Sequence, residues 1–198
     1  MGAAVRPRAR RLTRIIAGRG KGRRLKTPRG TETRPTGARV RQALFDILAQ
    51  VVPGCRFLDA FAGAGGVGLE ALSRGAARVV FVDRAAAAVA AVRANLAALG
   101  SLGGEAQVYR QDARVALRGF AAGGSSFDVV YLDPPYEGNE YEPVLEQAEG
   151  ILAAGGVAVA EHFHKRRLPE RIGTLVRTRS ERVGDHRLSF YRRQEESA

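Results

Sequence analysis

The chain contains the segment Phe57-Leu58-Asp59-Ala60-Phe61-Ala62-Gly63-Ala64-Gly65-Gly66-Val67-Gly68, in which a short apolar run leads into a glycine-rich loop. Gly63, Gly65 and Gly68 match the pattern G-x-G-x-x-G, which lets the backbone approach a ligand closely and turn into a helix. Asp83 ends the next apolar run, twenty residues after Gly63. An acid at that spacing is typical of a hydrogen bond to the ribose hydroxyls of an adenosine cofactor. The segment therefore predicts a nucleotide-type cofactor site at the end of a strand.

Strands and helices are expected to alternate on either side of this segment. Apolar runs predict strands at 55–59, 78–83, 106–110, 126–132 and 155–161, and the intervening segments predict helices at 66–75, 85–99, 112–119 and 140–153. Such alternation favours a parallel sheet covered by helices on both faces. Two further strands are expected in the tail, around Leu175-Val176 and Leu188–Tyr191, as an antiparallel pair at one edge.

The net charge of +12 is concentrated at the two ends of the chain. Residues 1–41 hold 14 Lys and Arg against one acid, residues 42–161 hold 8 against 14, and residues 162–198 hold 10 against 5. Positive charge concentrated in this way favours a nucleic-acid partner. We predict a flexible basic arm at 1–12, a basic hairpin and helix that contact nucleic acid at 13–54, and a cofactor-binding core at 55–198. In the extension, short strands are expected at 13–17 and 24–27 and a helix at 38–50.

Composition also excludes several classes of protein. No apolar run has the length of a membrane span and no secretory leader is visible, so a cytoplasmic protein without membrane contact is expected. Cys55 is the single cysteine, which excludes an internal disulfide. One cysteine and three histidines are also too few and too scattered for a typical zinc site, so no metal is expected.

The acids beside the glycine loop indicate which cofactor the site holds. Asp59 lies four residues before Gly63. A carboxylate there would repel the pyrophosphate of a dinucleotide, which makes an NAD-dependent oxidoreductase the less favoured alternative. It would suit the ammonium of a methionine-type group, so we interpret the pocket as a site for S-adenosylmethionine. Asp112 has two interpretations that stay open: a contact to the adenine amino group, and an N-cap of the next helix.

The residues Asp133-Pro134-Pro135-Tyr136 follow the apolar run 127–132. Two consecutive prolines cannot continue a strand, so they impose a rigid exit at its carboxyl end. Asp133 and the Pro134 carbonyl would accept the hydrogens of an exocyclic amino group, and Tyr136 would stack on the ring that carries it. A simple turn with a buried tyrosine is the alternative, and the cofactor motifs favour the amine site.

Together, these motifs resemble the Rossmann-like S-adenosylmethionine methyltransferases that modify exocyclic amino groups. The 16S rRNA (guanine(966)-N2)-methyltransferase family of bacteria is similar in further segments, namely Arg14–Gly18, Lys21–Leu25, Arg34-Pro35-Thr36, Arg39-Val40-Arg41, Leu44-Phe45 and Gly68–Gly75. The resemblance covers roughly residues 13–193. It is weakest over 162–187, where little beyond a basic, strand-forming character matches.

This resemblance implies a class I methyltransferase fold with a seven-stranded, mostly parallel sheet. The implied reaction is methylation of a guanine N2 amino group in 16S rRNA, within the small ribosomal subunit or its assembly intermediate, by a monomer that releases S-adenosylhomocysteine. The expected catalytic residues are Asp133, Pro134 and Tyr136. The expected cofactor-binding residues are Asp59, Phe61, Gly63, Gly65, Asp83, Arg84, Asp112 and Ala113. The expected RNA-binding residues are Arg14, Arg19, Lys21, Arg23, Arg24, Lys26, Arg39 and Arg41.

Two other functions remain open from the sequence. The same amine site would also seat an adenine, so adenine-N6 methylation of DNA or RNA is the main alternative. A ribosome-assembly factor that keeps only the binding fold is the other, and the intact acidic and aromatic set disfavours it. His162 and His164 are interpreted as exposed loop histidines that straddle Phe163.

Overall fold

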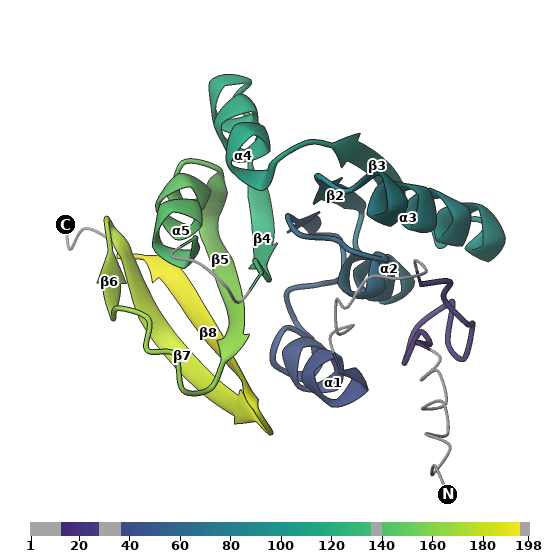
Figure 1. Cartoon of the computed structure of the whole chain (residues 1–198), viewed down its shortest axis with the longest axis horizontal. Helices are drawn as coiled ribbons and strands as arrows, with labels where there is room; N and C mark the ends of the chain where they lie inside the picture. The colour runs from purple at the N-terminus through teal and green to yellow at the C-terminus, as the bar shows by residue number, and fades with distance from the viewer. Residues whose placement is uncertain (1–12, 28–36, 136–139, 195–198) are drawn as a thin grey trace, which may run out of the picture.

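The apolar runs form the central strands of the fold in the computed structural model, which describes residues 13–27, 37–135 and 140–194 (Figure 1). The strands are β1 Arg56–Asp59, β2 Arg78–Asp83, β3 Glu105–Arg110, β4 Phe127–Leu132, β5 Leu152–Phe163, β6 Arg171–Ile172, β7 Leu175–Val183 and β8 His186–Arg193. The helices are α1 Ala38–Ile47, α2 Gly66–Ser73, α3 Ala86–Leu99, α4 Ala113–Ala122 and α5 Tyr141–Glu149. No helix in this part of the chain combines the length and apolarity needed to cross a membrane.

The eight strands of the described residues form one mixed sheet in the order β3-β2-β1-β4-β5-β8-β7-β6. The first five in that order are parallel, whereas β8, β7 and β6 are antiparallel to their neighbours. The chain runs outward from β1 through β2 to β3 and then returns to the other side of β1 to form β4. The strand order therefore reverses between β1 and β4, which is where open α/β sheets bind ligands at the carboxyl ends of their strands.

Successive residues of the central strands face two separate apolar layers, because strand side chains alternate between faces. On β1, Phe57 packs in a cluster with residues of α1, α2 and α3, whereas Leu58 packs in a cluster with residues of α4 and α5. Helices thus cover both faces of the sheet, as the alternation of elements predicts.

The sheet has one strand more than the seven that the resemblance implied. The additional strand is β6, whose two residues pair with Val176 and Leu175 at the edge of the sheet. The tail strands β7 and β8 form the expected antiparallel pair, and β8 joins them to β5. Helix α1 ends at Ile47 rather than at residue 50, and α5 ends at Glu149 rather than at residue 153.

The N-terminal hairpin is less regular than predicted. Its β pairing in the described residues is one isolated bridge between Arg14 and Arg24. Backbone hydrogen bonds still cross the hairpin on both sides of this bridge, from Leu25 to Thr13, from Ile15 to Arg23 and from Gly22 to Ile15. Beyond Ile15, the amides of Ile16 and Ala17 donate instead to the Glu70 carboxylate of α2, at 2.7 and 2.9 Å. The division of the chain at residue 54 stays a prediction, and the arm at 1–12 lies outside the described residues.

Candidate functional site

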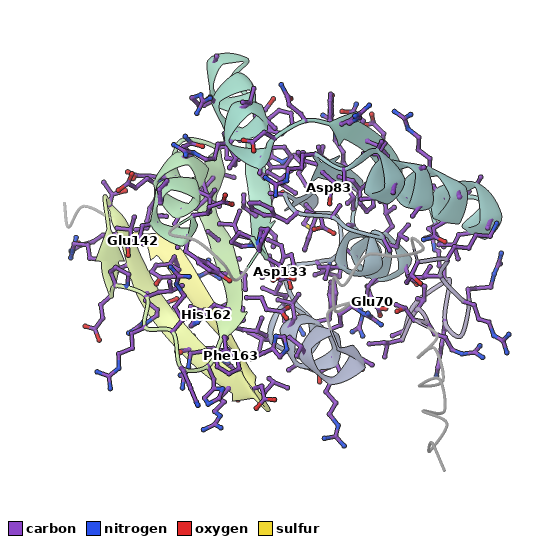
Figure 2. All side chains as sticks on the ribbon, viewed as in Figure 1. Glu70, Asp83, Asp133, Glu142, His162 and Phe163 are labelled. Carbon is purple, nitrogen blue, oxygen red and sulfur yellow. The ribbon has the colours of Figure 1, made fainter. Side chains whose placement is uncertain are left out.

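The glycine loop at 63–68 and the segment Asp133-Pro134-Pro135, which we call the proline corner, lie at the same end of the sheet. This is the end where the parallel strands have their carboxyl ends, and we refer to it as this edge. β1 and β4 are parallel neighbours with Asp59 opposite Tyr131, two residues before Asp133. The Ala60 amide donates to the Tyr131 carbonyl at 3.1 Å, and this bond extends the pairing into the loop. The loop after β1 and the corner after β4 therefore lie side by side at the carboxyl ends of these two strands. Figure 2 shows Asp83 and Asp133 on this edge.

Asp59 is a buried acid with one unsatisfied oxygen. Its side chain is 1% exposed, and its Oδ2 accepts a hydrogen bond from the Gly68 amide at 2.9 Å. Oδ1 has no hydrogen-bond partner among the described residues. Burial raises the pKa of Asp59 to about 7, and the nearby Asp83 and Glu161 charges add to the rise, whereas the Gly68 amide opposes it. A cationic group beside Oδ1 would satisfy this oxygen and stabilise the ionised form.

The three glycines of the loop have different physical roles. Gly63 has φ +52° and open space where a Cβ would stand, so a ligand can approach its backbone. Gly65 adopts φ +81° as the N-cap of α2, a left-handed conformation that favours glycine. A Cβ on Gly68 would lie 2.3 Å from the Phe81 ring, so Gly68 allows α2 to pack closely on β2.

Asp83 holds the loop in place as well as ending β2. One carboxylate oxygen accepts from the Gly63 amide and the other from the Ala85 amide, each at 2.8 Å. Each oxygen of an ionised carboxylate can accept a second bond, so ribose hydroxyls remain possible donors. The neighbouring Arg84 is exposed, and the partly buried Phe61 packs against the cluster that contains residues of α4 and α5.

Asp112 is an N-cap. Its side chain accepts from the amides of Arg114 and Val115 at 3.0 and 3.4 Å, at the start of α4. One of the two interpretations left open is thus confirmed, and the adenine contact stays a prediction. Ala113 is buried in the same turn.

The proline corner continues directly from β4. Asp133 is half-buried, Pro134 is buried and Pro135 is exposed, whereas Tyr136 lies outside the described residues. The Tyr141 hydroxyl donates to the Glu161 carbonyl at 3.0 Å and lies 3.5 Å from the Pro134 carbonyl oxygen. Because a carbonyl oxygen has two lone pairs, the Pro134 carbonyl can still accept a bond from a ligand.

Two buried glutamates support this edge and were not expected from the sequence. Glu70 accepts from the amides of Ile16 and Ala17 and from Arg74, and thereby attaches the N-terminal segment to α2. Glu161 accepts from the Tyr131 hydroxyl, and its Oε1 lies 2.7 Å from His186 Nδ1. The sequence feature that indicates a buried acid at Glu161 is its position directly after the apolar run 157–160 of β5.

The predicted RNA contacts fall into two groups. Arg14, Arg19, Lys21, Arg23, Arg24, Lys26 and Arg39 are exposed. Of these, Arg19 and Arg23 donate to the carbonyls of Leu102 and Ala98, beside the end of α3. The prediction for Arg41 was wrong, because its side chain is 2% exposed and donates to the Arg14 carbonyl inside the protein. The segment Arg34-Pro35-Thr36, which contributes to the family resemblance, lies outside the described residues.

The interpretation of His162 was also wrong. This residue is 1% exposed within β5, and its ring nitrogens contact the Ser189 hydroxyl at 2.9 Å and the Phe163 carbonyl at 3.0 Å. Burial lowers the pKa of His162, which favours the neutral ring. Strand β5 extends to residue 163 because β8 pairs with it, so residue 162 is not in a loop. His164 is partly exposed, and its Nδ1 lies 3.0 Å from the Asp185 carbonyl.

A cavity of about 310 Å³ lies away from this edge. Its lining includes Arg56 and Arg78, the first residues of β1 and β2, together with Ser126 before β4. It therefore opens near the amino ends of these strands and is separate from the candidate site. Among the described residues, no group of three or more His, Cys, Asp or Glu is placed to hold a metal ion.

Comparisons with known proteins agree with this architecture. A family model described as "Conserved hypothetical protein 95" matches residues 13–192. The chain is 42% identical over 182 residues to "Putative rRNA methyltransferase YlbH" of Bacillus subtilis, which covers 91% of this chain and 98% of the relative. It is 37% identical over 146 residues to "Ribosomal RNA small subunit methyltransferase D" of Haemophilus influenzae, covering 74% of this chain and 73% of the relative.

A solved structure is similar over nearly the whole fold. "Putative methyltransferase yhhF from Escherichia coli" superposes with a TM-score of 0.78 at 32% identity, covering 93% of this chain and 99% of that chain. This similarity confirms the prediction of a Rossmann-like methyltransferase fold.

Proposed function

Because the chain belongs to the family of the small-subunit rRNA methyltransferases D, we propose that it methylates rRNA with S-adenosylmethionine as the methyl donor. The finer proposal is that the target is the exocyclic N2 amino group of one guanine in 16S rRNA, of the position 966 type. The observation that supports methyl transfer to an amine is the pairing of β1 with β4, which brings Asp59 and the proline corner to one edge. The choice of guanine N2 rests on the family resemblance.

The residues around the glycine loop fit S-adenosylmethionine. The buried, unsatisfied Oδ1 of Asp59 would accept the ammonium of the methionine part. The open space at Gly63 would admit the cofactor against the backbone, and Asp83 has acceptor capacity left for ribose hydroxyls. Asp112 and Ala113 would border the adenine, with Phe61 and Arg84 beside the loop. When bound, the cofactor supplies an electrophilic methyl group on a sulfonium.

The proline corner would hold the acceptor amine. An aromatic amine is a poor nucleophile because its lone pair is delocalised into the ring. Acceptance of its two hydrogens by Asp133 and the Pro134 carbonyl would favour a pyramidal nitrogen with an available lone pair. Alignment rather than strong base catalysis would then supply most of the rate gain. Asp133 or a water molecule would take the released proton.

The target guanine must leave its stack to reach this corner. Tyr136 would hold the extruded base, since base stacking on an aromatic ring contributes about 1–3 kcal/mol. The exposed cations of residues 14–26, together with Arg39, would contact phosphates. RNA binding should therefore weaken steeply as the salt concentration rises.

The experiment is a transfer assay with radiolabelled S-adenosylmethionine and three acceptors: small subunits that lack the modification, bare 16S rRNA, and DNA. We expect label in rRNA, and mass spectrometry of nuclease fragments should locate it on a guanine. Label on adenine would replace the guanine-N2 proposal with adenine-N6 methylation. A thermal shift with NAD but none with S-adenosylmethionine would overturn the cofactor assignment.

A further inference from the structure

Phe163 ends β5 as an aromatic side chain that is 40% exposed. Residues 164–167 follow it as His-Lys-Arg-Arg, which we call the basic turn. Figure 2 shows Phe163, Asp133 and Asp83 in sequence along the molecule, from lower left to upper right. The proposed function uses neither Phe163 nor the basic turn.

The strand register relates Phe163 to the amine site. Ala160 of β5 pairs with Leu132 of β4, so Asp133 lies one residue past this pair and Phe163 three residues past it. Neighbouring strands are about 5 Å apart, and two residues span roughly 7 Å along a strand. The Tyr131 hydroxyl of β4 donates to Glu161 of β5, so these two side chains meet. Asp133 comes two residues after Tyr131, and Phe163 comes two residues after Glu161. The exposed ring therefore lies beside the amine site, on the adjoining strand.

The basic turn is held in a defined position. The Arg166 amide donates to the Phe163 carbonyl at 2.9 Å, and the His164 amide donates to the Asp185 carbonyl at 2.8 Å. The Arg166 guanidinium lies over the Tyr141 ring, 4.7 Å from its centroid. Lys165 and Arg167 are exposed. The turn thus presents two cations to solvent next to an exposed aromatic ring.

An exposed ring beside cations is the combination that proteins use to bind single-stranded nucleic acid, because bases stack on the ring and phosphates contact the cations. We propose that Phe163 stacks on a base adjacent to the target nucleotide and that Lys165 and Arg167 contact the phosphates of that strand. This inference rests on the proposed function, since it names a second RNA-binding surface of the same site. The cofactor would then lie at the carboxyl ends of β1 and β2, and the target base at the end of β4. The flanking base would lie at the end of β5.

The test for stacking replaces the ring at residue 163. Phe163→Ala should weaken the Kd for 16S rRNA by roughly 5- to 150-fold, the range expected for one stacked base. Phe163→Leu should bind rRNA as weakly as Phe163→Ala, because leucine keeps apolar bulk without a ring face. Phe163→Trp keeps a ring face and should bind rRNA as tightly as the wild type. Tyr109→Ala is the matched control, because Tyr109 is 39% exposed on β3, at the far edge of the sheet. Equal affinity for Phe163→Ala and the wild type would overturn the proposal.

The test for phosphate contacts uses the salt dependence of binding. Each contact to a single strand contributes about 0.7 to the slope of log K against log salt. The double variant Lys165→Ala/Arg167→Ala should lower that slope by about 1.4, whereas Phe163→Ala should leave it unchanged. The control Arg93→Ala/Arg118→Ala removes two exposed cations from α3 and α4 and should keep the slope. A slope equal to that of the wild type in the Lys165/Arg167 variant would remove the basic turn from the interface.

Two further readouts separate this inference from the proposed function. S-adenosylmethionine affinity and the thermal midpoint should not change in any Phe163 variant. If the wild type methylates rRNA and Phe163→Ala does so equally well, the inference fails alone. If the wild type transfers no methyl group to rRNA, the proposed function fails, and RNA affinity still decides whether Phe163 stacks. A further outcome is that Phe163→Ala methylates small subunits more slowly while it binds bare rRNA as tightly as the wild type. That result would indicate that Phe163 contacts a ribosomal protein, and it would overturn stacking.

Discussion

The carboxylate of Asp59 accepts a hydrogen bond from the Gly68 amide at 2.9 Å, and this bond joins the end of β1 to the first turn of α2. Amides in a first helical turn have no partner within the helix, so the bond satisfies one of them. A helix N-terminus favours a negative charge. Burial nevertheless dominates and raises the pKa of Asp59 to about 7. The charge of this acid therefore depends on whether a cation lies beside it.

Cofactor affinity should depend on pH through Asp59. The ionised acid binds an ammonium, and ionisation is half complete at about pH 7. The Kd for S-adenosylmethionine should therefore tighten roughly tenfold from pH 6 to 7.5, as one proton is released on binding. Titration calorimetry in buffers of different ionisation enthalpy measures both quantities. Asp59→Asn should bind more weakly with a flatter profile, and an unchanged pH dependence in this variant would refute the assignment.

The same acid should make the unbound protein less stable as pH rises. The pKa of Asp59 is raised from 3.8 to about 7 in the folded chain. The unfolded chain therefore loses this proton at lower pH, and the contribution of Asp59 to the free energy of unfolding falls between those two values. Asp59→Asn should flatten that fall in urea titrations from pH 4 to 7. An equally steep fall in the variant would show that other groups cause it.

Asp133→Asn should slow methyl transfer while cofactor binding survives. The asparagine amide has one acceptor oxygen and no negative charge, and its NH2 group donates rather than accepts. The amine would therefore lose its orientation, and the rate should fall by about 10²- to 10³-fold. Single-turnover assays with labelled cofactor measure the rate. Asp128→Asn is the control, because Asp128 lies near the start of the same strand and pairs with Arg56 at 2.9 Å. Retained turnover in Asp133→Asn would remove Asp133 from the mechanism.

Gly68→Ala should destabilise the fold. The added Cβ would lie 2.3 Å from the Phe81 ring, so α2 or the ring must shift, at a cost of about 1–3 kcal/mol. Gly119→Ala is the matched control within α4, where a Cβ meets nothing within 4 Å. It should stabilise the protein by about 0.5–1 kcal/mol. Urea unfolding of both variants measures the difference, and equal stabilities would contradict the close packing of α2 on β2.

Arg39 and Arg41 should behave differently although they are two residues apart on α1. Arg41→Ala removes a buried cation that donates to the Arg14 carbonyl and should cost about 2 kcal/mol or more of stability. Arg39 is exposed, so Arg39→Ala should change stability by no more than about 0.5 kcal/mol. It should instead lower the salt slope of RNA binding by about 0.7. The opposite pattern would place Arg41 at the RNA.

The local pattern of the chain predicted most of the elements and the residues at the strand ends. Apolar runs bounded by glycines located β1 to β5, because burial and turn formation depend on adjacent residues. The same reasoning found Asp59, Asp83 and the proline corner. It did not find β6, which has two residues and exists because β7 pairs with it.

The amino-acid sequence by itself determined the glycine loop, the acids at the strand ends and the rigid corner, since each follows from the conformational limits of neighbouring residues. Only the tertiary structure decided that β4 lies beside β1, that Arg41 and His162 are buried, and that Glu70 binds amides 53 and 54 residues away. Local periodicity assigns a residue to a face, but the segments that cover that face come from distant parts of the chain. Whether a polar side chain there meets solvent or a buried partner is therefore set by packing.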